Sequence, residues 1–285
     1  MKIEDAQKQL NLIQNQTFSL DDLNNKLQSL KLDCVTADNQ SQAKEIWILQ
    51  TIIQIHIEYR SAFNLLKNKK YYDGWRQLEQ IEIITSRLKK HFQYDKEQYC
   101  LWHIEKSVKN LQVIFPYKIF ASTEILKKKK KCSVCDKEVS IRKPCGHITG
   151  EIYDGEMCYR IVTEAEIMGI SLVENPGNKY SVMFLKDETT DEEIDQYDYT
   201  SVDYLFDHLE SPYEEWNLEV LQMKIRKENY GNLGRNEKCT CGSNKKFKKC
   251  CSNSIGKYYP HYKFVLKNPS KKMILANTLK IKANS

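Results

Sequence analysis

The sequence predicts a mainly α-helical chain with a small α+β module in its second half. Two observations lead to this prediction. Residues 1–115 contain no proline and a single glycine, Gly74, and this composition favours long helices. After Lys127–Lys131, cysteines, glycines and short apolar runs replace the long amphipathic segments, which is typical of a smaller and less regular module.

The first 115 residues are expected to form a helical bundle. Residues 43–68 are apolar around much of the helical circumference, which predicts a core helix. A turn is expected within residues 69–74, with Asp73 and Gly74 as the break, followed by an amphipathic helix over 75–92. A further helix is expected over 97–115, ending there because a residue before proline disfavours the helical conformation.

The second half is expected to combine strands and short helices. Two β-rich runs around an Asn-Pro-Gly-Asn sequence predict a β-hairpin over 169–185. Residues 200–210 have apolar side chains at helical spacing, with Thr200 or Ser201 as the expected N-cap. Residues 214–227 are also expected to be helical.

Charge is strongly segregated along the chain, although the net charge is only +6. Residues 187–215 contain twelve Asp or Glu and no Lys or Arg, whereas residues 254–285 contain seven Lys and no acid. Lys127–Lys131 form a run of five. These basic segments either neutralise the acidic stretch or bind an external polyanion such as a nucleic acid. The acidic stretch could hold Mg²⁺ in a nuclease, but a solvated acidic face is the favoured interpretation.

The cysteines are expected to be reduced thiols in the cytoplasm. The chain has no apolar run long enough for a membrane helix, and its first residues do not resemble a signal peptide. Ten cysteines in a reducing compartment favour metal binding over disulfides. Eight of them fall into two clusters, and Cys34 and Cys100 are expected to be buried within helices.

The central cluster offers five candidate ligands for one metal ion. Cys132 and Cys135 have the spacing of a zinc knuckle, and Cys158 begins a segment with a helical pattern, where a helix N-terminus favours a thiolate. These three are expected to be ligands. The fourth is either Cys145 or His147, with the other in the second shell. A site rich in thiolates makes a poor Lewis acid, so a structural Zn²⁺ is expected here.

The terminal cluster is a short loop with two pairs of thiols. Cys239 and Cys241 are followed by Cys250 and Cys251, and Gly242 allows a sharp turn after the first pair. Four thiolates around Zn²⁺ give a net charge of −2, which neighbouring lysines offset. Those lysines are Lys245, Lys246, Lys248 and Lys249.

This segment resembles the SEC-C motif, the metal-binding tail of the preprotein translocase motor. The resemblance rests on Gly234, Arg235, Asn236, Cys239, Cys241, Gly242, Ser243, Lys245, Lys246, Phe247, Lys248, Cys250 and Cys251. Family members often have Asp-Pro in place of Glu237–Lys238, Pro at Thr240 and Gly at Asn244. The resemblance implies a zinc site, with iron as an alternative, in a module that docks onto an export chaperone or the ribosome. The chain has no P-loop, so translocase activity is not expected.

Four regions are therefore expected: a helical domain (1–126), a central zinc-binding α+β module (127–229), a SEC-C module (230–253) and a basic tail (254–285). The favoured function is a non-enzymatic bacterial adaptor with two structural zinc sites and a protein or ribosomal partner. The alternatives are a nucleic-acid-binding protein and a metal-dependent nuclease. The nucleic-acid-binding protein would use Lys127–Lys131 and the basic tail, with four aromatic side chains of the tail as stacking groups: Tyr258, Tyr259, Tyr262 and Phe264.

Overall fold

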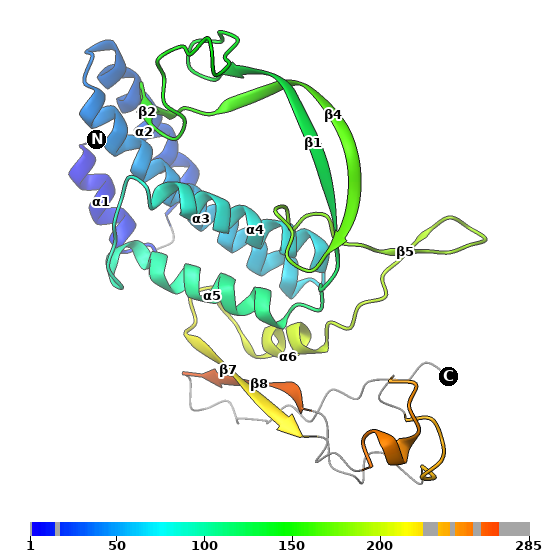
Figure 1. The fold of residues 1–285 in the computed structure, drawn as a ribbon. Coiled ribbons are helices and arrows are strands. Elements are labelled where there is room, and N and C mark those ends of the chain that lie inside the picture. The colour runs from blue at the N-terminus through cyan, green and yellow to red at the C-terminus, as the bar shows by residue number, and fades with distance from the viewer. Residues whose placement is uncertain (1, 15–17, 225–232, 240–242, 253–257, 268–285) are drawn as a thin grey trace. The chain divides into compact units, whose positions relative to one another are not determined.

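The molecule consists of two compact units, residues 1–213 and 214–285. The structure is a computed structural model that describes residues 2–14, 18–224, 233–239, 243–252 and 258–267 (Figure 1). Among these residues there are six α-helices and four small sheets of two strands each. None of the described helices is both long and apolar enough to cross a membrane.

Five helices form the first part of unit one, which confirms the predicted helical region. They are α1 (Ile3–Asn11), α2 (Leu20–Thr36), α3 (Gln40–Lys67), α4 (Tyr71–Leu88) and α5 (Leu101–Ile114), with a 3₁₀ turn, η1 (Gln98–Cys100), before α5. Ser19 caps α2 by accepting a hydrogen bond from the N–H of Asp22 at 3.2 Å. Helix α5 ends where expected, because Phe115 before Pro116 is extended.

Helix α3 is the core helix predicted over 43–68. It spans 28 residues, and its buried side chains lie on several faces rather than along one stripe. Helices α2 and α4 pack against it along their lengths, and α1 and α6 touch it as well. A helix surrounded in this way must be apolar around most of its circumference. The sequence pattern therefore predicted its burial correctly.

The break expected at Asp73–Gly74 was placed wrongly. The chain reverses at 68–70, where Lys69 has a φ of +60°, and α4 begins at Tyr71. Gly74 lies in the first turns of α4 and is buried against α3. A Cβ atom at this position would lie 2.3 Å from Cδ2 of Leu66. The glycine therefore permits the close approach of two helices and does not form the turn.

A long two-stranded ribbon follows the helices. Strand β1 (Phe120–Cys132) pairs with the antiparallel strand β4 (Arg160–Val173), and most of the side chains between their ends are exposed. The Lys127–Lys131 run, expected at the start of a separate module, lies inside β1. The helix expected after Cys158 was wrong, because that segment forms β4. The hairpin expected over 169–185 was also wrong, because its first run pairs with β1.

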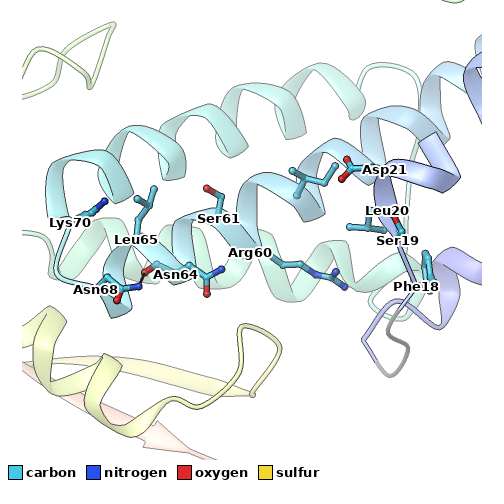
Figure 2. A pocket seen from close by; sticks show the side chains of 11 residues that line it. Phe18, Ser19, Leu20, Asp21, Arg60, Ser61, Asn64, Leu65, Asn68 and Lys70 are labelled. Atoms are coloured by element: carbon cyan, nitrogen blue, oxygen red, sulfur yellow. Dashed lines mark hydrogen bonds between the residues drawn. The ribbon is translucent and has the colours of Figure 1, made fainter. Parts of the chain in front are cut away.

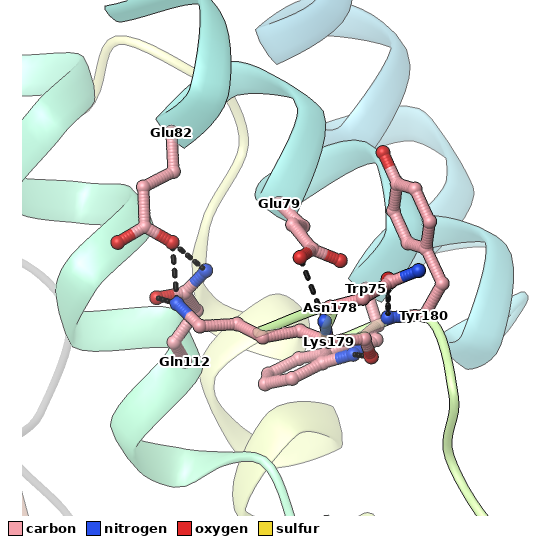
Figure 3. A network of polar contacts seen from close by, with 7 residues as sticks. All are labelled: Trp75, Glu79, Glu82, Gln112, Asn178, Lys179 and Tyr180. Carbon is pink, nitrogen blue, oxygen red and sulfur yellow. Dashed lines mark hydrogen bonds and ion pairs between the residues drawn. The ribbon is translucent and has the colours of Figure 1, made fainter. Parts of the chain in front are cut away.

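Residues 175–182 fix the base of this ribbon to the helices (Figure 3). Trp75 Nε1 of α4 donates to the carbonyl of Lys179 at 2.7 Å, and Glu79 Oε1 accepts from the N–H of the same residue at 2.7 Å. The Lys179 ammonium forms an ion pair with Glu82 and donates to Gln112 Oε1 of α5 at 3.1 Å. The Asn-Pro-Gly-Asn sequence is thus part of a loop, and Lys179 directly after it is held against α4 and α5.

The acidic stretch contains short strands and one helix. Strands β5 (Leu185–Lys186) and β6 (Glu193–Ile194) pair with each other, and α6 (Thr200–His208) follows as predicted. The expected cap at Thr200 or Ser201 was wrong, because α6 begins at Thr200 and its N-cap residue is Tyr199, whose side chain makes no capping hydrogen bond. Asp198 Oδ1 accepts a hydrogen bond from the N–H of Thr200 at 2.9 Å in the turn before the helix. Acidic side chains here serve as hydrogen-bond acceptors in turns.

The second unit contains β7 (Trp216–Lys224), paired with the antiparallel strand β8 (Tyr258–Leu266). The helix expected over 214–227 was therefore wrong over the residues of β7. Residues 258–266 of the expected basic tail are also a strand. In β8, Phe264 is buried and its ring lies 6.3 Å from that of Trp216, so it packs inside the unit.

A buried network of hydrogen bonds joins α3 to the end of the first unit. His56 is fully buried, and its Nε2 lies 2.9 Å from the carbonyl oxygen of Tyr99 while its Nδ1 lies 2.9 Å from the hydroxyl of Tyr213. Because a carbonyl only accepts, Nε2 bears the proton and Nδ1 accepts from Tyr213. Arg60 Nε in turn donates to the Tyr213 oxygen at 2.9 Å. Burial lowers the pKa of His56 to about 3, so the ring is neutral at physiological pH.

The buried His56 makes the first unit sensitive to acid. Below its unfolded pKa of about 6.5, the unfolded chain binds a proton that the folded chain excludes until about pH 3. The free energy of unfolding should then fall by about 1.4 kcal/mol per pH unit from this group. Urea unfolding from about pH 7 to about pH 4 should show a smaller loss for His56→Gln, which does not titrate. Equal losses in the two proteins would contradict this assignment.

Gly74 should tolerate no side chain. Gly→Ala inside a helix ordinarily stabilises a protein by about 0.5–1 kcal/mol. Here Gly74→Ala is expected to destabilise the unit by about 1–3 kcal/mol, because the new methyl group overlaps Leu66. Thermal unfolding measures this effect. The double variant Leu66→Ala/Gly74→Ala should lose less free energy of unfolding than the sum of the losses in the two single variants. A higher Tm for Gly74→Ala alone would disprove the overlap.

Candidate metal centres

The knuckle of the central group forms where β1 ends. Cys132 is the last residue of β1 and is fully buried, and the turn closes with Asp136 N–H donating to the Cys132 carbonyl at 2.9 Å. Burial opposes ionisation of this thiol, but the N–H groups of Val134 and Cys135 point at its sulfur and lower the Cys132 pKa to about 6. The backbone is thus arranged to stabilise a thiolate.

Four donor atoms converge at this knuckle. The sulfurs of Cys132, Cys135 and Cys145 and an imidazole nitrogen of His147 all lie within 4.8 Å of one another. Cys132 Sγ and His147 Nδ1 are 3.7 Å apart. Zn–S bonds of about 2.3 Å at tetrahedral angles place ligand atoms roughly 3.8 Å apart, so a zinc ion fits this donor set. The structure brings both Cys145 and His147, which the sequence left as alternatives, to the same group.

Cys158 approaches the group from the other strand. It follows the short hairpin of β2 (Ile152–Tyr153) and β3 (Glu156–Met157), and its sulfur lies 3.8 Å from that of Cys132. Arg160 lies beside it: Nη1 is 3.8 Å from Cys145 Sγ and 3.7 Å from Cys158 Sγ, and Nη2 donates to the His147 carbonyl at 2.6 Å. Sequence reasoning missed Arg160, because no spacing rule marks a cation beside a thiolate group.

Helices α2 and α3 and the turn after α4 hold this region in place. His91, three residues after the end of α4, has its Nε2 2.6 Å from the carbonyl oxygen of Gly150. Lys31 of α2 is buried and pairs with Glu156 at 2.5 Å, while Gln40 of α3 donates to Asp154 at 2.6 Å. Asp154 and Glu156, which precede Cys158 in sequence, therefore bind the helices. The ribbon is anchored to the helices at both ends.

Three of the four cysteines in the terminal group lie among the described residues. The sulfurs of Cys239, Cys250 and Cys251 lie within 4.8 Å of one another, and those of Cys250 and Cys251 are 3.8 Å apart. Cys241 lies outside the described residues. Ser243 Oγ is 3.0 Å from Cys250 Sγ, so a hydroxyl also faces the group.

The backbone around the terminal group forms a tight hairpin-like loop. Lys238 and Lys246 form a β-bridge, Cys239 N–H donates to the Lys245 carbonyl at 2.8 Å, and a 3₁₀ turn, η3 (Phe247–Lys249), leads to Cys250. Asn244 has a φ of +55°. Glycine adopts this left-handed conformation readily and asparagine is among the next most tolerant, which explains why a glycine position can be occupied by asparagine.

Comparison with known proteins identifies this terminal segment. Residues 235–253 match the family model described as the SEC-C motif, which confirms the resemblance inferred from residues 234–251. The match covers a small part of the chain and includes all four terminal cysteines. No curated protein and no solved structure matches the chain. The chain therefore contains a SEC-C motif, a metal-binding sequence, and both of its cysteine groups have donor atoms close enough to hold a metal ion.

Proposed function

We propose that this protein is a non-enzymatic bacterial adaptor of the cytoplasm that binds two structural zinc ions. One observation supports the proposal most strongly: the described donors of each cysteine group converge at the spacing of tetrahedral ligands, with sulfur as the main donor. A zinc ion with four protein ligands has no open position for substrate. Thiolate and imidazole donors favour zinc, and iron is the alternative at the SEC-C centre.

The SEC-C module is proposed to dock onto a ribosomal or protein partner. Lys245, Lys246 and Lys249 are exposed around the terminal thiols, so the metal-bound loop would present positive charge. An acidic protein patch or the phosphate backbone of ribosomal RNA complements such a surface. The helical domain is proposed to supply a second contact.

A groove on the helical domain suits that second contact. It has a volume of about 880 Å³ and lies between residues 18–21 and the second half of α3 (Figure 2). Arg60, Asn64 and Asn68 line one wall with hydrogen-bonding groups, and the partly exposed Ile57 adds an apolar surface. Surfaces that combine apolar and hydrogen-bonding groups in this way are typical of protein–protein interfaces.

The alternative functions have weaker support. In the basic run of β1, Lys128, Lys129 and Lys131 form ion pairs with Glu166, Glu164 and Asp136, respectively, at 2.5–2.9 Å. These pairs reduce the charge available to a nucleic acid. In the acidic stretch, Asp187 accepts hydrogen bonds from Thr189 and Thr190, and these bonds lower its pKa to about 2. Carboxylates engaged in turns favour a structural role over Mg²⁺ chemistry.

Metal stoichiometry tests the two-centre proposal. The purified chain should contain two zinc ions, and Cys239→Ser/Cys241→Ser should contain one while retaining its helical circular dichroism. Cys34→Ser is the matched control, because Cys34 is a buried cysteine of α2 outside both groups, and it should retain two ions. Loss of both ions from the double variant, or its global unfolding, would contradict two independent centres.

Capture from a bacterial lysate, with and without ribonuclease, tests docking. The intact chain should retain ribosomal components or an export chaperone, and both Cys239→Ser/Cys241→Ser and Lys245→Glu/Lys246→Glu should lose them. Lys127→Glu/Lys130→Glu, the same charge change in β1, is the control and should behave like the intact chain. Equal capture by all variants would exclude the SEC-C module as the docking element.

A further inference from the structure

The central group has one donor more than a tetrahedral ion requires. Cys132, Cys135, Cys145, His147 and Cys158 all contribute a sulfur or an imidazole nitrogen to the same region. A structural zinc ion binds four ligands. The proposed function requires only that a zinc ion binds here, and it leaves open which donor is excluded. The inference below rests on that proposal and identifies the excluded donor.

Mutual distance separates the five donors. Cys132, Cys135, Cys145 and His147 each lie within 4.8 Å of the other three, as the vertices of a coordination tetrahedron must. Cys158 does not belong to this set of mutual neighbours, although its sulfur is 3.8 Å from that of Cys132. An ion placed among the four mutual neighbours would have a complete ligand set.

The loop that contains Cys145 and His147 is held so that both can face the ion. Gly146 between them has a φ of +89°, a conformation that glycine adopts readily and that allows a tight turn between the two donors. The loop after them is fixed, because Tyr153 accepts a hydrogen bond from the N–H of Ile148 at 3.0 Å. The Tyr153 ring also packs edge-on against the His147 imidazole at 4.7 Å. These contacts orient the imidazole before a metal ion binds.

Cys158 is fixed by its own backbone. Its N–H donates to the Glu151 carbonyl at 2.8 Å, and its carbonyl accepts from the N–H of Gly150 at 2.7 Å. Its sulfur lies against the guanidinium of Arg160, which also reaches Cys145 and the His147 carbonyl. Cys158 thus lies beside Cys132, and Arg160 lies beside Cys145 and His147, which is the place of outer-shell groups.

We propose that the central centre binds zinc through Cys132, Cys135, Cys145 and His147. Cys158 is an outer-shell thiol. Arg160 is a positioning residue that holds the Cys145 sulfur and the His147 backbone while offsetting the negative charge of the thiolates. The resulting site has three sulfur ligands and one nitrogen ligand.

The ligand set is tested in the Cys239→Ser/Cys241→Ser background, where the central centre is the one intact centre. X-ray absorption at the zinc edge, measured with no substitution in the central group, should show three sulfur ligands and one nitrogen ligand. In the same background, Cys158→Ser should retain one zinc ion, whereas Cys145→Ser and His147→Asn should each lose it in competition with a chromogenic chelator. Circular dichroism identifies any variant that fails to fold.

Arg160→Gln provides a second readout. Removal of an outer-shell partner typically lowers metal affinity about 10–100-fold, so this variant should bind one zinc ion with affinity reduced to that extent. Lys69→Gln, an exposed cation on a helix-to-helix turn, is the control and should leave the affinity unchanged. Unchanged affinity in Arg160→Gln would overturn its positioning role.

The results of these experiments distinguish an error in the ligand set from an error in the proposed two-centre function. A spectrum with four sulfurs, or loss of zinc from Cys158→Ser with retention in Cys145→Ser or His147→Asn, would overturn the ligand set while leaving a central metal centre in place. A background protein that binds no zinc at all would overturn the two-centre proposal itself.

Discussion

The burial of α3 is the interaction on which the first unit depends. Its side chains are covered by α2 and α4 along its length and by α1 and α6 at further positions. Each fully buried leucine or isoleucine contributes roughly 1.5–3 kcal/mol, so this one helix supplies much of the apolar burial. Gly74 sets how closely α4 can approach, and the surrounding helices then provide fixed points to which the ribbon and the central cysteines attach.

Contacts with this helical scaffold position the residues of the central metal centre. The ribbon of β1 and β4 is bound at its base through Lys179 and at its far end through Lys31 and His91. Both ends are attached to the helices, so the scaffold holds the knuckle in the position where its donor atoms converge. The exposed middle of the ribbon is protected from association with other strands by its charged side chains. Lysines in β1 pair with glutamates in β4, and charged side chains of this kind discourage edge-to-edge association of strands.

The helices and the thiols could be predicted from the sequence, and the strands could not. Apolar periodicity without proline identifies helices locally, and cysteine spacing identifies a knuckle. Strand β4 contains Glu, Ala, Ile and Met in an order that also suits a helix, and its partner β1 lies on the far side of the knuckle. Strand β7 has the same difficulty, because its partner β8 follows the SEC-C motif. Arg160 escaped notice because only the folded ribbon brings it to the sulfurs.

The pairing of β7 with β8 means that the SEC-C residues form an insertion between two strands. Lys224 and Tyr258 are partners in the sheet, and the matched residues 235–253 lie in the loop between them. A metal ion that cross-links this loop shortens the effective segment that the hairpin must close, and closure costs less for a shorter loop. Metal affinity and hairpin stability are then reciprocally linked. Chelation would weaken the sheet, so the rigidity of the second unit would follow the supply of metal in the cell.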